Sequence, residues 1–230
     1  MTSSNDAPRL VTRATRKTGR YALLGASPEA ARVIWFVLHG YAQLVPRFLR
    51  HFDGVVPPDT CIVAPEGLSR FYVDMPRGDG AHLQRVGATW MTREDREHDI
   101  ADALYWLDTV HDDIVGACPQ APTIGVLAFS QGVATATRWL ASGTVQPRAF
   151  VAWAGGLAND VAADTLRAAL AEAQVVLVRG VHDALLSAEQ GEALHAQLRQ
   201  LWPRAEYVTF EGAHHLERAV LAPLLARLSP

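Results

Sequence analysis

Residues 122–132 read PTIGVLAFSQG, and this stretch predicts the fold of the chain. Its first part is a near-continuous apolar run, which is typical of a β-strand covered on both faces. Gln131-Gly132-Val133-Ala134 begins a helical segment at once, so Ser130 lies at a sharp corner between a strand and a helix. A serine at such a corner is also a common helix N-cap, and the pattern alone leaves that structural role open.

The alternation of strand and helix continues along the rest of the chain. Further apolar runs of strand length are residues 32–38, 61–65, 149–154 and 175–179, with a more exposed one at 205–210. Segments of helical period lie at residues 93–115, 131–141, 161–173, 187–201 and 214–228. This order predicts an α/β protein with a mostly parallel central sheet and helices on both faces. Since no repeat or linker divides the chain, we expect one domain at 18–230, after a flexible arm at 1–17.

Length and composition restrict the function classes. A chain of 230 residues that is 49% hydrophobic can bury a full core. Its net charge of −3 gives no electrostatic attraction for nucleic acid or an anionic membrane. No run reaches the roughly 18 apolar residues of a transmembrane helix, and residues 1–17 lack the apolar core of a secretory signal. We therefore expect a soluble cytoplasmic protein without an integral membrane segment.

The two cysteines give no sign of a disulfide framework or a metal site. Neither Cys61 nor Cys118 has a partner at the spacing that such sites use. We expect both to be packing residues in a reducing compartment and expect no metal or organic cofactor.

A carboxylate that could work with Ser130 follows another predicted strand. A serine hydroxyl is a poor nucleophile, and it needs a base and an acid nearby to be activated. Asp183 lies in the loop just after the strand at 175–179 and is the candidate acid. Asp160 and Asp164 compete for this role, but they follow a different strand and lie near a predicted helix start.

The candidate base follows the last predicted strand, where two histidines are adjacent. We favour His214 over His215, because His214 falls at the junction between the loop and the helix. The carboxyl ends of parallel strands share one edge of a sheet, and ligand sites gather there. Ser130, Asp183 and His214 are therefore expected to meet at that edge, in the chain order nucleophile, acid, base.

The motifs around these residues resemble those of a known family. Residues 128–132 are similar to the nucleophile elbow of the α/β-hydrolase fold, with Ala128 in place of the first glycine. Together with the segments at 38–40, 180–183 and 212–214, the chain resembles the phospholipase/carboxylesterase family of small, acyl-protein thioesterase-like serine esterases. The likeness spans about residues 32–228.

This resemblance implies a single-domain α/β-hydrolase fold and a serine esterase that cleaves carboxylic esters through a Ser-His-Asp triad. It also implies an oxyanion hole made by the backbone N–H groups of Tyr41 and Gln131, with His39 as a supporting side chain. Two departures leave the substrate open, so thioesters and lysophospholipids stay possible alongside simple esters. The residues after Asp183 read ALLS where relatives carry Pro and a Val-Pro pair, and Tyr41 follows Gly40 where relatives continue toward a second glycine.

The segment at residues 66–91 fits neither strand nor helix periodicity. Long irregular stretches inside a compact domain are often functional loops or lids, so we expect a loop or small lid here. Its large apolar residues are candidate walls of the substrate pocket, and packing of the loop onto the domain is an equal alternative for them. They are Phe71, Tyr72, Trp90 and Met91.

Two other classes of function share the predicted fold. One is a catalytically silent hydrolase fold retained as a small-molecule binding module. The other is a dienelactone-type or peptidase-like hydrolase. An enol-lactone specialist would more naturally carry cysteine at position 130, and a prolyl-peptidase relative would bring a large extra domain. The small-molecule ester hydrolase is therefore the interpretation that the sequence favours.

Overall fold

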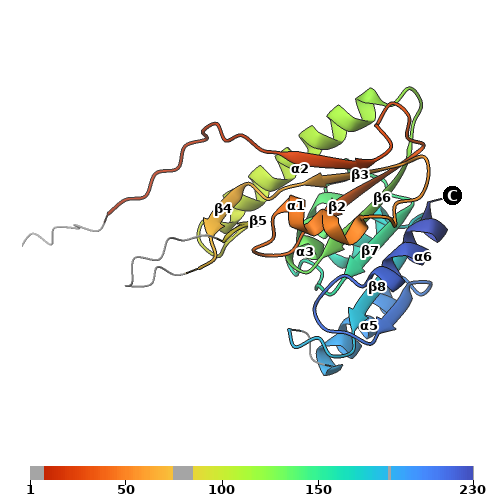
Figure 1. Ribbon diagram of the computed structural model, residues 1–230. Helices are drawn as coiled ribbons and strands as arrows, with labels where there is room; N and C mark the ends of the chain where they lie inside the picture. The colour runs from red at the N-terminus through yellow and green to blue at the C-terminus, as the bar shows by residue number, and fades with distance from the viewer. Residues whose placement is uncertain (1–7, 75–84, 186–187, 230) are drawn as a thin grey trace, which may run out of the picture.

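The computed structural model describes residues 8–74, 85–185 and 188–229, and within them β-strands alternate with helices (Figure 1). The strands are β1 Tyr21–Gly25, β2 Val33–Leu38, β3 Thr60–Pro65, β4 Ser69–Tyr72, β5 Val86–Thr89, β6 Thr123–Phe129, β7 Ala149–Trp153, β8 Gln174–Gly180 and β9 Glu206–Phe210. The helices are α1 Val45–Phe48, a 3-10 turn η1 Leu49–Phe52, α2 Arg96–Ala117, α3 Gln131–Ala141, α4 Ala163–Ala169, α5 Ala188–Leu201 and α6 Arg218–Leu228.

In the described residues the main sheet has seven strands in the order β1-β3-β2-β6-β7-β8-β9. Strand β1 runs antiparallel to β3, and every other neighbouring pair is parallel. The chain order crosses over at β2, which lies between β3 and β6, and from β6 onward the strands add in sequence toward one edge. The predicted mostly parallel sheet is confirmed.

Both faces of this sheet are covered, which explains the near-continuous apolar strands. On β2, Ile34, Phe36 and Leu38 pack into one core and the alternate residues into the other. Helices α2, α3, α4 and α5 supply side chains to the first core, and α1 and α6 to the second. Successive side chains of a strand point to opposite faces, so a strand buried on both sides must be apolar throughout.

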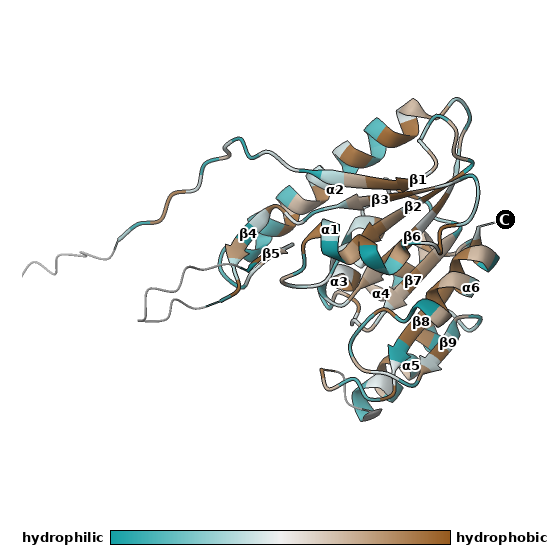
Figure 2. Cartoon of the chain, viewed as in Figure 1, coloured by the Kyte–Doolittle hydropathy of each residue, from teal (hydrophilic) through white to brown (hydrophobic). Residues whose placement is uncertain are grey.

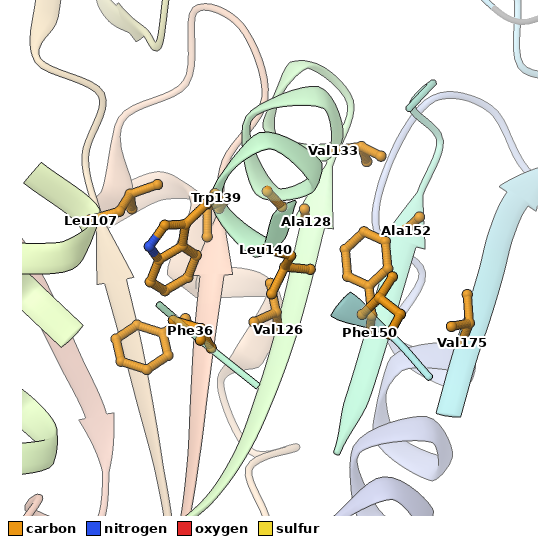
Figure 3. Packing of buried hydrophobic residues seen from close by; sticks show 14 of the residues in the cluster. Phe36, Leu107, Val126, Ala128, Val133, Trp139, Leu140, Phe150, Ala152 and Val175 are labelled. Carbon is orange, nitrogen blue, oxygen red and sulfur yellow. The ribbon is translucent and has the colours of Figure 1, made fainter. Parts of the chain in front are cut away.

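The first core is built around large aromatic side chains. The rings of Phe36 from β2 and Trp139 from α3 meet edge to face, with centroids 5.4 Å apart. Figure 3 shows the Trp139 ring directed toward Phe36, and the Leu107 side chain directed toward Trp139. Figure 2 shows the central strands as mainly hydrophobic, while α2 and α5 alternate hydrophobic with hydrophilic residues. No helix in the described ranges is both long and apolar enough to cross a membrane.

The segment at 66–91 contains more regular structure than its sequence indicates. Strands β4 and β5 pair antiparallel in a small second sheet, with Ser69 opposite Thr89 and Tyr72 opposite Val86. An isolated bridge between Gln43 and Ala88 then joins this hairpin to the loop after β2. Residues 75–84 of the expected lid, and residues 1–7 of the expected arm, lie outside the described ranges.

A buried carboxylate, Glu66, ties this region to the sheet. It is 1% exposed and accepts hydrogen bonds from Arg20 (2.7 and 3.0 Å), Arg70 (2.9 Å) and the Val45 N–H (3.1 Å). Burial opposes ionisation of this carboxyl, but the three donors outweigh that cost and lower the pKa of Glu66. Glu66 thus joins the end of β3 to β4, to α1 and to the segment before β1.

Replacing Glu66 with glutamine should destabilise the protein by about 2 kcal/mol at neutral pH, because charge-assisted hydrogen bonds are lost. Because the pKa of Glu66 is lowered by folding, its stabilisation is fully present above the usual carboxyl value of 4.5 and is lost as pH falls through the folded value. Urea denaturation should therefore show a difference between Glu66→Gln and wild type that shrinks in acid. An equal difference at neutral and acidic pH would contradict this account.

Candidate active site

The predicted site residues follow three parallel strands at their carboxyl ends. Ser130 comes directly after β6, Asp183 lies three residues beyond β8, and His214 lies four residues beyond β9. Strands β7 and β8 separate β6 from β9 in the sheet, so the three residues approach from different positions along the same edge. This is the edge where the parallel strands of open α/β sheets form their ligand sites.

The turn at Ser130 is backbone-strained. Its φ is 54° and its ψ is −120°, a conformation that residues with a side chain rarely adopt. Its N–H donates to the Trp153 carbonyl of β7 at 2.9 Å, which holds the turn against the neighbouring strand. Although Ser130 occupies the N-cap position of α3, its hydroxyl makes no capping bond within the described chain. The hydroxyl is therefore available for another partner.

Glycines on both sides let the backbone close tightly around this turn. A Cβ added at Gly132 would lie 2.7 Å from the carbonyl oxygens of Leu38 and His39 at the end of β2. A Cβ at Gly155 would lie 2.2 Å from the carbonyl oxygen of Ser130. Both distances are too short for real atoms, so glycine is needed at each position for close approach.

The hydroxyl of Ser130 joins a continuous chain of hydrogen bonds. Its Oγ lies 2.9 Å from His214 Nε2, and His214 Nδ1 lies 2.7 Å from Asp183 Oδ2. The side chain of Asp183 is fully buried, and its other oxygen accepts the Leu185 N–H at 2.9 Å. This fixes the carboxylate, which in turn orients the imidazole toward Ser130.

Close packing of two loops brings Asp183 and His214 together. The His182 N–H donates to the Gly212 carbonyl at 3.0 Å, and the Val181 N–H donates to the Phe210 carbonyl at the same distance. A Cβ at Gly180 would meet the Gly212 carbonyl oxygen at 2.2 Å, so the loops approach more closely than larger residues would permit. The loop after β8 is thereby held against the loop after β9.

The alternative residues lie elsewhere. His215 Nε2 is 3.4 Å from Glu217, and its carbonyl accepts the Trp153 indole N–H. Asp160 is held by Arg138 and Arg96, and hydrogen bonds from Arg138 are the main reason that its pKa falls to about 2. Asp164 pairs with Arg167. The structure thus brings together Ser130, Asp183 and His214, the residues that the sequence pattern favours.

Of the two backbone donors expected from the sequence, Gln131 adjoins Ser130 in the chain, and Tyr41 follows a residue that packs on the serine. Gln131 is the first residue of α3, where backbone N–H groups have no partner within the helix. In the described part of the chain, no acceptor contacts the Tyr41 N–H, whereas the preceding Gly40 N–H donates to Gln43 Oε1 at 2.7 Å. A Cβ at Gly40 would lie 3.0 Å from the Cβ of Ser130, so this loop packs directly on the serine.

The predicted pocket residues occupy different environments. The ring of Phe71 lies 5.3 Å from that of Tyr41, close to the loop after β2. Tyr72, the next residue of β4, is exposed and points to the other face of the hairpin. Trp90 is 3% exposed, which favours the packing alternative for this residue. Met91 is half-buried, and its carbonyl accepts a hydrogen bond from Gln131 Nε2 at 3.0 Å.

Two contributors to the site were not identified from the sequence. The Thr89 hydroxyl donates to the Met91 carbonyl at 2.8 Å and accepts a hydrogen bond from Gln131 Nε2 at 2.9 Å, and Gln43 Oε1 accepts the Gly40 N–H. The sequence alone assigned neither side chain a role in supporting the site, and only these tertiary contacts show it. Within the described ranges, no group of three or more His, Cys, Asp or Glu side chains is arranged to hold a metal ion.

The fold and the site together define the class of protein. A parallel sheet covered on both faces, with a Ser-His-Asp hydrogen-bonded chain at the carboxyl ends of its strands, is the arrangement of an α/β-hydrolase. Residues 60–218 match the family model "Serine hydrolase (FSH1)", and the chain belongs to this family.

Solved structures share this fold at low sequence identity. The esterase PE8 is 23% identical with a TM-score of 0.65, over 91% of this chain and 97% of its own. Acyl-protein thioesterase 2 of Zea mays is 16% identical with a TM-score of 0.66, over 92% and 100%. A Bacillus cereus carboxylesterase is 13% identical with a TM-score of 0.60, over 91% and 93%. A search of curated protein sequences gave no match.

Gly155→Ala should displace the Ser130 backbone, because the added methyl group meets the Ser130 carbonyl rather than a flexible side chain. We expect a loss of about 1–3 kcal/mol in the free energy of unfolding and slower covalent labelling of Ser130 by a fluorophosphonate. Gly156→Ala is the matched control, since a Cβ there meets no described atom within 4 Å. Equal behaviour of the two variants would rule out this close contact as the support of the turn.

Proposed function

We propose that this serine hydrolase cleaves carboxylic esters through an acyl-enzyme intermediate on Ser130. The observation that carries the proposal is the unbroken hydrogen-bonded chain from Ser130 Oγ through His214 to the buried Asp183, with distances of 2.9 and 2.7 Å. Such a chain makes an otherwise weak hydroxyl nucleophilic, because the base is already in contact with the proton that it must remove.

In the first half of the reaction, Ser130 Oγ attacks the ester carbonyl carbon while His214 Nε2 takes the hydroxyl proton. Asp183 accepts the Nδ1–H, so it selects the tautomer with a free Nε2 lone pair and stabilises the imidazolium that forms. The Leu185 N–H holds the second oxygen of Asp183, which keeps the carboxylate from rotating away from His214.

The negative charge of the tetrahedral intermediate falls on the former carbonyl oxygen. The N–H groups of Tyr41 and Gln131 are the proposed donors to it, and removal of one such donor typically costs about 2.7–4 kcal/mol of barrier. His214 then protonates the leaving alcohol, and water repeats the sequence on the acyl-enzyme. This acyl transfer requires no metal or organic cofactor.

The surroundings of the site support a small, largely apolar ester as the substrate. Exposed apolar side chains lie on the loops that carry the site: Tyr41, Val181 and Leu185. The contact between Tyr41 and Phe71 adds an aromatic surface beside the proposed oxyanion donor. Thioesters and lysophospholipids share the same carbonyl chemistry and are alternative substrates for it.

Hydrolysis of p-nitrophenyl esters, from acetate to dodecanoate, tests this proposal directly. Ser130→Ala should abolish turnover and fluorophosphonate labelling, because no nucleophile remains. Ser142→Ala is the control, since Ser142 lies at the other end of α3 and its hydroxyl bonds the Trp139 carbonyl. Wild-type protein that is folded but neither turns over these esters nor accepts the label would favour a binding module instead.

Asp183→Asn should keep the acceptor for the Leu185 N–H but lose the charge that orients His214. We expect kcat to fall by about 10³–10⁴-fold, as when the acid of a triad becomes an amide. Asp160→Asn should retain most of the activity, because Asp160 contacts Arg138 and Arg96 rather than the site. Steady-state kinetics on p-nitrophenyl butyrate decide this, and similar losses in the two variants would refute the role of Asp183.

A further inference from the structure

The imidazole of His39 is completely buried at the end of β2, and both of its ring nitrogens are engaged. Nε2 lies 2.9 Å from the backbone nitrogen of Gly67, in the loop between β3 and β4. Nδ1 lies 2.7 Å from the carbonyl oxygen of Gly40, the residue that follows His39. This side chain therefore links two loops, and the mechanism above makes no use of it.

These two contacts fix the protonation of the ring. A backbone N–H can only donate, so Nε2 must accept the bond from Gly67 and cannot carry a proton. A carbonyl oxygen can only accept, so Nδ1 must carry the proton that bonds Gly40. Burial is the main reason that the pKa of His39 is lowered to about 4, which keeps this Nδ1–H tautomer neutral at physiological pH.

The bond to the Gly40 carbonyl also sets the direction of the next N–H. The peptide between Gly40 and Tyr41 is trans and planar, so its carbonyl and its N–H point in opposite directions. With the carbonyl held against His39, the Tyr41 N–H is turned away from the His39 ring. The Gly40 backbone meanwhile packs on Ser130, where a Cβ would be 3.0 Å from the serine Cβ.

We propose that His39 is a positioning residue for the oxyanion hole, which aims the Tyr41 N–H by holding the Gly40 carbonyl through its Nδ1–H. This inference rests on the proposed function, because it assigns His39 a role in the same ester hydrolysis. His39 does not touch the substrate, and its effect on the reaction is transmitted through a single peptide plane.

Trp90 extends this arrangement to the second proposed donor. Its ring stacks on His39 with centroids 4.9 Å apart, and its indole N–H donates to the His39 carbonyl at 2.8 Å. Its backbone N–H donates to the side chain of Gln131 at 3.2 Å. One buried residue thus contacts both His39 and Gln131, so the two halves of the oxyanion hole are held in one hydrogen-bonded unit.

A purely structural role for His39 is the alternative. The loop has other attachments, since the Gly40 N–H bonds Gln43 and the Ala42 N–H donates to the Ala88 carbonyl at 2.9 Å. If these attachments aim the Tyr41 N–H, the loss of either His39 hydrogen bond should have the same effect. If the Gly40 carbonyl bond aims it, the two bonds should differ in their effect on turnover.

Two substitutions, each of which places an amide group near one of the two ring nitrogens, separate the bonds. In His39→Asn the amide nitrogen takes the place of Nδ1, so the bond to Gly40 is kept and the bond to Gly67 is lost. In His39→Gln the amide reaches the place of Nε2, so the Gly67 N–H keeps an acceptor and the Gly40 carbonyl loses its donor. Each variant loses one buried hydrogen bond, so thermal unfolding should report similar losses of stability for both.

Kinetics on p-nitrophenyl butyrate should then distinguish them. We expect His39→Asn to keep most of the wild-type kcat, and His39→Gln to lose about 10²–10³-fold in kcat with little change in KM. Equal losses of kcat in both variants would overturn the positioning role. If Ser130→Ala abolishes turnover in the same assay, such a result leaves the proposed function intact. Turnover that survives in Ser130→Ala would instead remove the proposed function.

The ring tautomer gives a readout on the wild-type protein, which does not depend on how the variants fold. The ¹⁵N chemical shifts of the His39 ring should report a neutral imidazole protonated at Nδ1, both near neutral pH and in mild acid. A ring protonated at Nε2, or one that becomes cationic in mild acid, would overturn the proposal. Ser130→Ala should give the same His39 shifts, because the tautomer is set by Gly40 and Gly67.

Discussion

The backbone at Ser130 adopts a conformation that costs of order 1–3 kcal/mol, and the surrounding sheet maintains it. The strain is sustained from three directions: by the hydrogen bond to Trp153 on β7, by Gly132 packed against the end of β2, and by Gly155 packed against the Ser130 carbonyl. Strands β2 and β7 flank β6 on its two sides. The placement of the serine therefore depends on the order of strands in the sheet rather than on local sequence alone.

The same dependence explains how much of the molecule could be predicted from the sequence. Buried strands can be recognised in the sequence by their apolar runs, and residues that follow parallel strands lie at one edge of the sheet. Ser130, Asp183 and His214 could therefore be assigned to that edge from the sequence alone. The hairpin β4–β5 could not be predicted, because its short strands lack strong periodicity and depend on the bridge between Gln43 and Ala88.

The roles of side chains that only support the site could not be predicted from the sequence either. Trp90 looks like a pocket wall by composition, but the structure buries it between His39 and Gln131. Glu66 gives no sign in the sequence that its carboxylate is buried, since that follows from the convergence of Arg20, Arg70 and the start of α1. Such contacts join residues distant in sequence, and no local pattern encodes them.

Glu66 and Gly67 are neighbours in the chain, and they bind different partners. The side chain of Glu66 holds Arg20 at the surface, and the N–H of Gly67 holds His39 beneath the site. The half-exposed Arg20 is therefore connected to the loop that packs on Ser130 through Glu66, Gly67 and the imidazole of His39. The segment before β1 is thus connected by hydrogen bonds and two adjacent residues to the imidazole beneath the loop that packs on Ser130, although this segment lies outside the sheet.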